Sequence, residues 1–229
     1  MTSEIVSRSI FRSSDTLEGA LIRILNERNQ RFRDPELRYP IVYQGLAMFS
    51  YLLRKAIHEG KVRYRRPIPT VPNVLHPPKT SQIPFASFMK LQLPFAPTFW
   101  SAFVITKQFL ESSEWVGYYS YNTGPLPVFD APMRGIRFTA QERQDTLGSS
   151  FYQVSAFSGL DNNGLFDVAG IVHVAGDVRM VKTYRNLNTS WNWNALVTPF
   201  GIVGTWGDDR DLSDRWRGWF WLWKMDWMQ

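Results

Sequence analysis

The feature that most constrains the fold of this chain is a succession of short strand-like runs between residues 113 and 225. Apolar and polar residues alternate within these runs, and Gly, Asn, Asp and Pro occupy the gaps, a pattern typical of antiparallel β-structure. The clearest pair, over 163–185, is joined by the turn signal Ala175-Gly176-Asp177, and we interpret it as a β-hairpin. The runs are 115–121, 133–139, 150–157, 165–173, 178–185, 191–197, 200–206 and 219–224.

Eight antiparallel strands of this length predict a mainly β fold. An up-and-down barrel is the favoured arrangement, because closure removes the free sheet edges, and its interior holds side chains or one small ligand. A two-sheet sandwich is the second possibility. The barrel domain is expected to span 113–229.

An α-helical extension is predicted at the N-terminus, over 1–66. Asp15 and Glu18 resemble a capping box ahead of a helix over about 16–31, and a second helix is expected from about Pro40 to Gly60. Both helices carry an apolar stripe. Such a stripe usually packs on the core of its own chain, although it can also bind a partner or a membrane surface.

Most of the chain's 14 prolines lie between residues 67 and 98. Because proline removes backbone donors and fixes φ, this segment is predicted to be extended. Its many apolar residues indicate that it lies along the main domain. We therefore assign 67–112 to a proline-rich connector that includes a short helix packed on the barrel.

The net charge of +6 comes from the N-terminal part of the chain, since residues 1–67 hold 13 Lys+Arg and 7 Asp+Glu. Solvated arginines on ordinary helices explain this excess, and a protein partner that docks on the basic helices is the functional alternative. No nucleic-acid-binding module accompanies the basic residues, so no nucleic acid is expected as a partner.

The composition also excludes several kinds of chemistry. The chain has no cysteine, which rules out disulfides, thiolate catalysis and cysteine-ligated metals. The histidines His58, His76 and His173 lack metal-ligand spacing, and no glycine-rich loop has a phosphate-binding pattern. We expect no metal and no cofactor. No apolar run is long enough for a signal core or a membrane span, and the expected location is cytoplasmic.

Strand parity indicates which side chains point into the barrel. In the run 178–185, Val178 and Met180 share a face with Lys182 and Tyr184, because successive side chains point to opposite sides of a strand. The apolar members favour an inward direction for this face, so an amine and a phenol are predicted inside.

Lys182 and Tyr184 are the candidate catalytic residues. Burial disfavours the charged form of a lysine, so Lys182 is a candidate base or Schiff-base amine, with Tyr184 as proton donor or oxyanion partner. A structural explanation is also open: Lys182 pairs with Asp167 or another carboxylate near the barrel mouth, and Tyr184 closes a hydrogen bond.

The same parity argument selects candidate ligand-binding residues. Most are aromatic residues on faces expected to be interior, whereas the direction of Arg137 is open. Five tryptophans between 216 and 227 are interpreted as a ligand wall, an interface or barrel core. The candidates are Tyr119, Tyr121, Arg137, Met180, Trp191, Trp193, Trp206 and Trp221.

Several segments together resemble the C-terminal barrel of fungal F-box-type proteins, which is a calycin or lipocalin-like barrel. The resemblance covers about half the chain, and nothing before residue 110 resembles an F-box. Its most specific motif is TPFGIVGTWG at 198–207. The other segments are WVGYY at 115–119, FSG at 157–159 with Asp161 and Gly164, VRMVKTY at 178–184, and WFWLWK at 219–224.

Together, the resemblance and the inward residues predict a lipocalin-like barrel that binds an apolar small molecule. A cofactor-independent isomerase, cyclase or dehydratase of fungal secondary metabolism is the enzymatic form of this prediction. It requires a cavity of several hundred cubic ångströms beside Lys182 and Tyr184. The alternative is an F-box-type protein-interaction module that recognises substrates and has no enzymatic activity.

Overall fold

A computed structural model of the chain describes residues 35–63, 74–79, 82, 105–121, 127–208 and 217–228. The helix predicted over 16–31 and most of the proline-rich connector lie outside these residues. The boundaries predicted between the three parts of the chain therefore stay a prediction.

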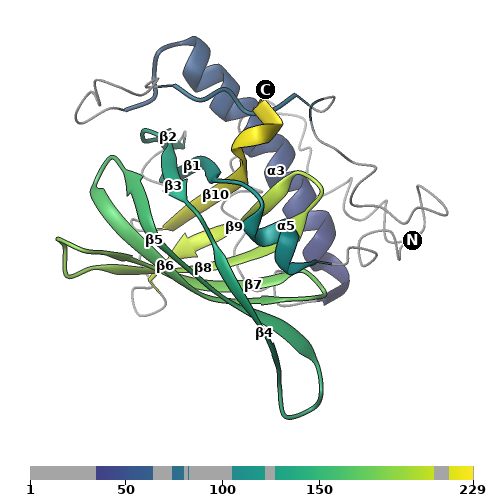
Figure 1. Cartoon of the computed structure of the whole chain (residues 1–229). Coiled ribbons are helices and arrows are strands. Elements are labelled where there is room, and N and C mark those ends of the chain that lie inside the picture. Colours follow the sequence, from purple (N-terminus) through teal and green to yellow (C-terminus); the bar gives the residue numbers. More distant parts are fainter. Residues whose placement is uncertain are drawn as a thin grey trace, which may run out of the picture.

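The described residues form a mainly β structure that is built around one antiparallel sheet (Figure 1). Its strands are β1 (Trp115–Tyr121), β2 (Val128–Phe129), β3 (Met133–Ile136), β4 (Thr139–Gln144), β5 (Ser150–Asp161), β6 (Gly164–His173), β7 (Asp177–Tyr184), β8 (Ser190–Thr198), β9 (Gly201–Gly207) and β10 (Arg217–Lys224). The helices are α3 (Pro35–His58), α5 (Lys107–Glu111) and the short 3₁₀ helix η5 (Met225–Met228).

The sheet closes on itself as an eight-stranded antiparallel barrel, in the order β1-β3-β5-β6-β7-β8-β9-β10. Closure is made by β10 and β1, whose register pairs Trp115 with Lys224 and Tyr119 with Phe220. The predicted barrel is confirmed, and the sandwich is not observed.

The second predicted strand, 133–139, is divided in the structure. Its first half forms β3, and its last residue, Thr139, begins β4. Both of these strands pair with β5. The β4–β5 hairpin extends beyond the barrel (Figure 1). The short strand β2, which pairs with the end of β1, was not predicted.

Most of the barrel interior is lined by alternate residues along the strands, as parity predicts. On β7, Val178, Met180, Lys182 and Tyr184 are buried, while the residues between them are exposed. Aromatic side chains from β1, β8, β9 and β10 join them in one continuous cluster. The predicted inward face of β7 is therefore confirmed.

Helix α3 packs on the outer wall of the barrel over β9 and β10 (Figure 1). It begins at Pro35, earlier than the predicted start at Pro40, and a proline suits the first turn because its missing N–H has no helical partner there. The close approach depends on Gly45, since an added Cβ would lie 2.2 Å from the ring of Trp219.

Helix α5 covers the end of the barrel where β1 begins. Leu110 is fully buried in the interior cluster, and its carbonyl accepts a hydrogen bond from the indole of Trp115 at 2.8 Å. The opposite end, where β1, β5 and β7 finish, carries the polar residues described next.

Candidate functional site

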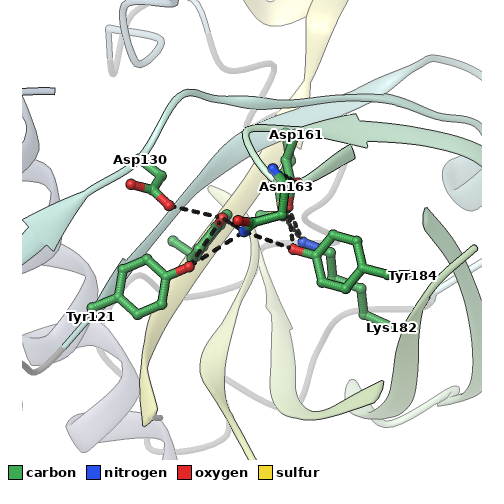
Figure 2. Close-up of polar contacts among 8 residues, drawn as sticks. Tyr121, Asp130, Asp161, Asn163, Lys182 and Tyr184 are labelled. Carbon is green, nitrogen blue, oxygen red and sulfur yellow. Dashed lines mark hydrogen bonds and ion pairs between the residues drawn. The ribbon is translucent and has the colours of Figure 1, made fainter. Parts of the chain in front are cut away.

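The candidate site lies inside the barrel, just below the end opposite α5. Its centre is the carboxylate of Asp161, the last residue of β5. Asp161 Oδ2 accepts hydrogen bonds from Lys182 Nζ, in a close ion pair, and from the Tyr184 hydroxyl at 2.7 Å (Figure 2). The Asp161 and Lys182 side chains are 0% and 3% exposed, so the pair is shielded from water.

The turn after β5 supplies a further hydrogen bond to this carboxylate. The backbone N–H of Asn163 donates to Asp161 Oδ1 at 2.8 Å. Gly164 follows with φ of 124°, a conformation that residues with a Cβ rarely adopt, so the turn is suited to glycine. The turn thereby places Asn163 above the pair.

The side-chain amide of Asn163 links the pair to two further tyrosines. Its Nδ2 lies 3.1 Å from the Tyr119 hydroxyl, 3.4 Å from that of Tyr121 and 3.3 Å from that of Tyr184 (Figure 2). The Tyr119 hydroxyl donates to Asp130 Oδ2 at 3.3 Å. Two buried carboxylates, one lysine and three phenols thus belong to one hydrogen-bonded network.

The amine of Lys182 is surrounded by aromatic rings as well as by Asp161. Nζ lies 4.0 Å from the ring centre of Phe166 and 4.7 Å from those of Tyr119 and Tyr184. The negative ring faces stabilise the ammonium and partly replace lost water. Burial lowers the pKa of Lys182, and the Asp161 carboxylate acts in the opposite direction.

The phenols of the network are held in the neutral form. Burial raises the pKa of Tyr119 and of Tyr184, and the charge of Asp161 raises both further. Burial also raises the pKa of Tyr121. These hydroxyls are therefore hydrogen-bond donors, and none is prepared to act as a phenolate base.

The space above Lys182 is small. The cavity bounded by Tyr119, Tyr121, Lys182, Tyr184 and three tryptophans has a volume of about 10 Å³. This is room for about one water molecule. The prediction of a cavity of several hundred cubic ångströms beside Lys182 and Tyr184 is wrong, because aromatic rings fill the barrel.

Six of the eight predicted ligand-binding residues lie in or beside this cluster. Tyr119, Tyr121, Trp191, Trp193 and Trp206 line the small cavity, and Met180 belongs to the same interior cluster. The rings of Tyr121 and Trp191 each pack edge to face on that of Trp206, with ring centres 5.2 and 5.3 Å apart.

Arg137 and Trp221 are not brought to the site. The Arg137 side chain is 69% exposed and pairs with Glu114 at 3.1 Å. Trp221 lies on the outer wall with Trp219 and Trp223, under α3. The tryptophans of β10 are thus neither a wall of the barrel cavity nor its core, because they occupy the outward face of the strand.

Asp161, Asn163 and Asp130 were not predicted as site residues. For Lys182 the sequence suggested Asp167 or another carboxylate near the barrel mouth, and the partner in the structure is Asp161. Asp167 lies on the outer face of β6 and pairs with Arg185 at 2.7 Å. A register shift between Ala156 and Gly159 reverses the parity of β5, which turns Asp161 inward. A glycine inside a strand often marks such a bulge, so Gly159 was the available signal.

Among the described residues, no group of three or more histidine or acidic side chains is arranged to hold a metal ion. None of the helices in the same part of the chain combines the length and the apolar composition needed to cross a bilayer. Comparison with known proteins found no matching family model, no matching curated protein and no matching solved structure.

Proposed function

We propose that the barrel binds a small molecule with an apolar body and one hydrogen-bond-accepting end, at the mouth beside Tyr121, Trp191 and Trp206. The observation that carries this proposal is the buried network of Asp161, Lys182 and Tyr184 directly below these rings. Apolar side chains would stabilise a purely structural core as well or better, since burying an ion pair costs solvation free energy.

The ligand's polar end would occupy the small cavity beside Lys182. The Lys182 ammonium presents N–H donors there beyond the one given to Asp161, whereas the single O–H groups of Tyr119 and Tyr184 already donate to carboxylates. Free N–H donors select an acceptor such as a carbonyl oxygen. The aromatic rings around the donors suit a flat apolar body. This combination of an apolar wall with a few polar groups is common in small-molecule sites.

Entry requires the aromatic rings at the mouth to move, because the cavity of about 10 Å³ holds no organic molecule. Trp191 is the side chain whose movement opens the mouth, since it is the first aromatic residue of β8 and is only partly buried. The bound form therefore differs from the structure in its ring positions.

A cofactor-independent isomerisation, cyclisation or dehydration is the reaction class that we propose if turnover occurs. The neutral phenols and the lysine–aspartate pair are able to hold a proton next to a bound carbonyl. General acid–base groups placed this way contribute about 10²- to 10⁴-fold to a rate. Turnover is a separate proposal from binding and is tested after it.

Binding is tested with two probes of nearly the same shape, 2-acetylnaphthalene and 2-ethylnaphthalene, by calorimetry and tryptophan fluorescence. The ketone should bind more tightly by roughly tenfold, the worth of one good hydrogen bond. Lys182→Met should remove that preference, and the surface substitution Arg179→Gln should leave it unchanged. Absence of saturable binding, both in the wild type and in Trp191→Ala, would contradict the proposal.

A second candidate is a protein-interaction module, as the resemblance to F-box-type barrels implies. It is favoured by Phe157, Leu165 and Val181 on the outer face of β5, β6 and β7, which are 62%, 42% and 39% exposed. Affinity capture with the wild type and with the double substitution Phe157→Ser and Val181→Ser separates the candidates. A partner lost in the variant, together with unchanged probe binding, would support interaction.

A further inference from the structure

A second and larger cavity lies outside the barrel, between α3 and the outer wall. Its volume is about 260 Å³, and its walls include Leu46 and Ala47 of α3, Trp221 of β10, Phe200 and Pro78. Small-molecule sites usually measure about 300 to 1,000 Å³, so this cavity is near the lower end of that range.

Most of the residues that line this cavity are apolar, and the polar ones are Tyr43, Ser50 and Arg54. The indole N–H of Trp221 donates to the Phe200 carbonyl at 2.8 Å, so the ring presents carbon atoms to the space. Leu46 is 5% exposed, and Trp221 is 3% exposed, which fixes both walls in the packed core. An occupant would gain contacts with rigid apolar surface.

One end of the cavity carries the guanidinium of Arg54. Its Nε donates to Ser50 Oγ at 3.4 Å, and its Nη2 donates to the carbonyls of Pro77 and Pro78 at 3.3 and 3.1 Å. These contacts hold the side chain in place with neutral acceptors. A guanidinium has five N–H donors, and the described residues accept only from Nε and Nη2, which leaves the two N–H groups of Nη1 for another acceptor.

The carboxylates in the described part of the chain also leave the positive charge of Arg54 without a counter-charge. Within the described ranges, no carboxylate oxygen lies at ion-pair distance from Arg54. A fixed cation at the end of an apolar cavity is complementary to a molecule with an apolar tail and an anionic head. Arginine binds a carboxylate with two parallel hydrogen bonds when geometry allows.

We propose that this cavity is a binding site for an apolar carboxylic acid, such as a medium-chain fatty acid, with the carboxylate on Arg54 and the tail against Leu46, Phe200 and Trp221. This site is separated from the barrel interior by the strand wall. It is independent of the function proposed for the mouth of the barrel.

The test compares decanoate with decanol, which share an alkyl chain and differ in the charged head. Binding to the full chain is measured by calorimetry and by tryptophan fluorescence, below the micelle concentration of decanoate. The wild type should prefer decanoate, and Arg54→Met should weaken decanoate binding by roughly 10- to 100-fold while leaving decanol binding within about twofold.

Two controls keep the result interpretable. Ala47→Trp fills the cavity and should abolish binding of both probes, whereas Arg143→Met removes an arginine from the distant strand β4 and should change neither. Retained decanol binding in Arg54→Met shows that the cavity is still formed. Failure of decanoate to saturate the wild type, or equal decanoate binding in Arg54→Met and wild type, overturns the proposal.

Discussion

The barrel contains a buried lysine at each end, and the two are held in different ways. Lys182 is 3% exposed and Lys224 is 4% exposed. Lys182 is in contact with the carboxylate of Asp161, whereas Lys224 Nζ donates to the hydroxyl of Ser112 at 2.7 Å and lies 4.3 Å from the ring centre of Phe109.

The difference shows what a carboxylate partner changes. Lys182 belongs to a network that extends through Tyr184 and Asn163 to other polar groups at the mouth. Lys224 joins the end of β10 to Ser112, the residue that caps α5, and burial lowers its pKa to about 8. We interpret Lys182 as part of a site and Lys224 as a structural link between the strand and the cap.

The largest expected effect comes from removing the charge of Asp161. Asp161→Asn leaves the ammonium of Lys182 buried without its counter-charge and should lower the free energy of unfolding by about 3 to 5 kcal/mol. Urea denaturation at pH 7 measures this loss. The double substitution Asp161→Leu with Lys182→Met should recover most of it, because both buried charges are then absent.

Asp167→Asn is the matched control for this prediction. Its carboxylate pairs with Arg185, but the two side chains are 34% and 43% exposed, so the loss should stay below about 1 kcal/mol. Equal losses for the two aspartates would mean that the buried pair has no special role.

A smaller effect is expected for the hydroxyl of Tyr184. Tyr184→Phe removes a 2.7 Å hydrogen bond to a carboxylate and should cost about 2 kcal/mol in the same assay. Tyr121→Phe is the comparison, since its hydroxyl makes contacts of 3.4 and 3.5 Å and its loss should cost about 0.5 kcal/mol. The reverse order would show that Tyr121 is more important to the network.

Removing the charge of Lys224 should raise the stability of the protein, whereas removing the charge of Asp161 should lower it. Lys224→Met removes a buried cation that has no carboxylate partner at ion-pair distance within the described residues, so stability at pH 7 should rise by about 1 kcal/mol. The control is Lys107, whose side chain is 60% exposed, and Lys107→Met should change stability little. A destabilised Lys224→Met protein would instead assign a net stabilising role to the bond with Ser112.

The most gradual effect is the pH dependence of this difference. The folded protein loses the Lys224 proton near pH 8, whereas the unfolded chain keeps it until about pH 10.5. Between these values the unfolded state binds more protons, so the wild type gains stability as the pH rises. The advantage of Lys224→Met should therefore shrink from pH 8 to pH 10.5, and a constant difference across denaturation curves in that window would contradict the lowered pKa.

Strand β7 shows how far local pattern extends, and β5 shows where it stops. On β7 the alternation of Val178, Met180, Lys182 and Tyr184 is unbroken, so parity predicts the buried face correctly. On β5 the shift between Ala156 and Gly159 changes the phase. Counting by two from Ala156 places Asp161 outside, whereas the bulge places it beside Lys182.

The sequence by itself determined most of the strands, their antiparallel order and the inward direction of Lys182 and Tyr184, because these follow from alternation within short segments. Only the tertiary structure decided what the two side chains meet, how much space remains above them and which face of β10 is outside. Alternation shows that Trp219, Trp221 and Trp223 share one face, but closure of the barrel and docking of α3 assign that face to the outer wall. Contacts of this kind join residues far apart in the chain, and their geometry depends on the whole fold.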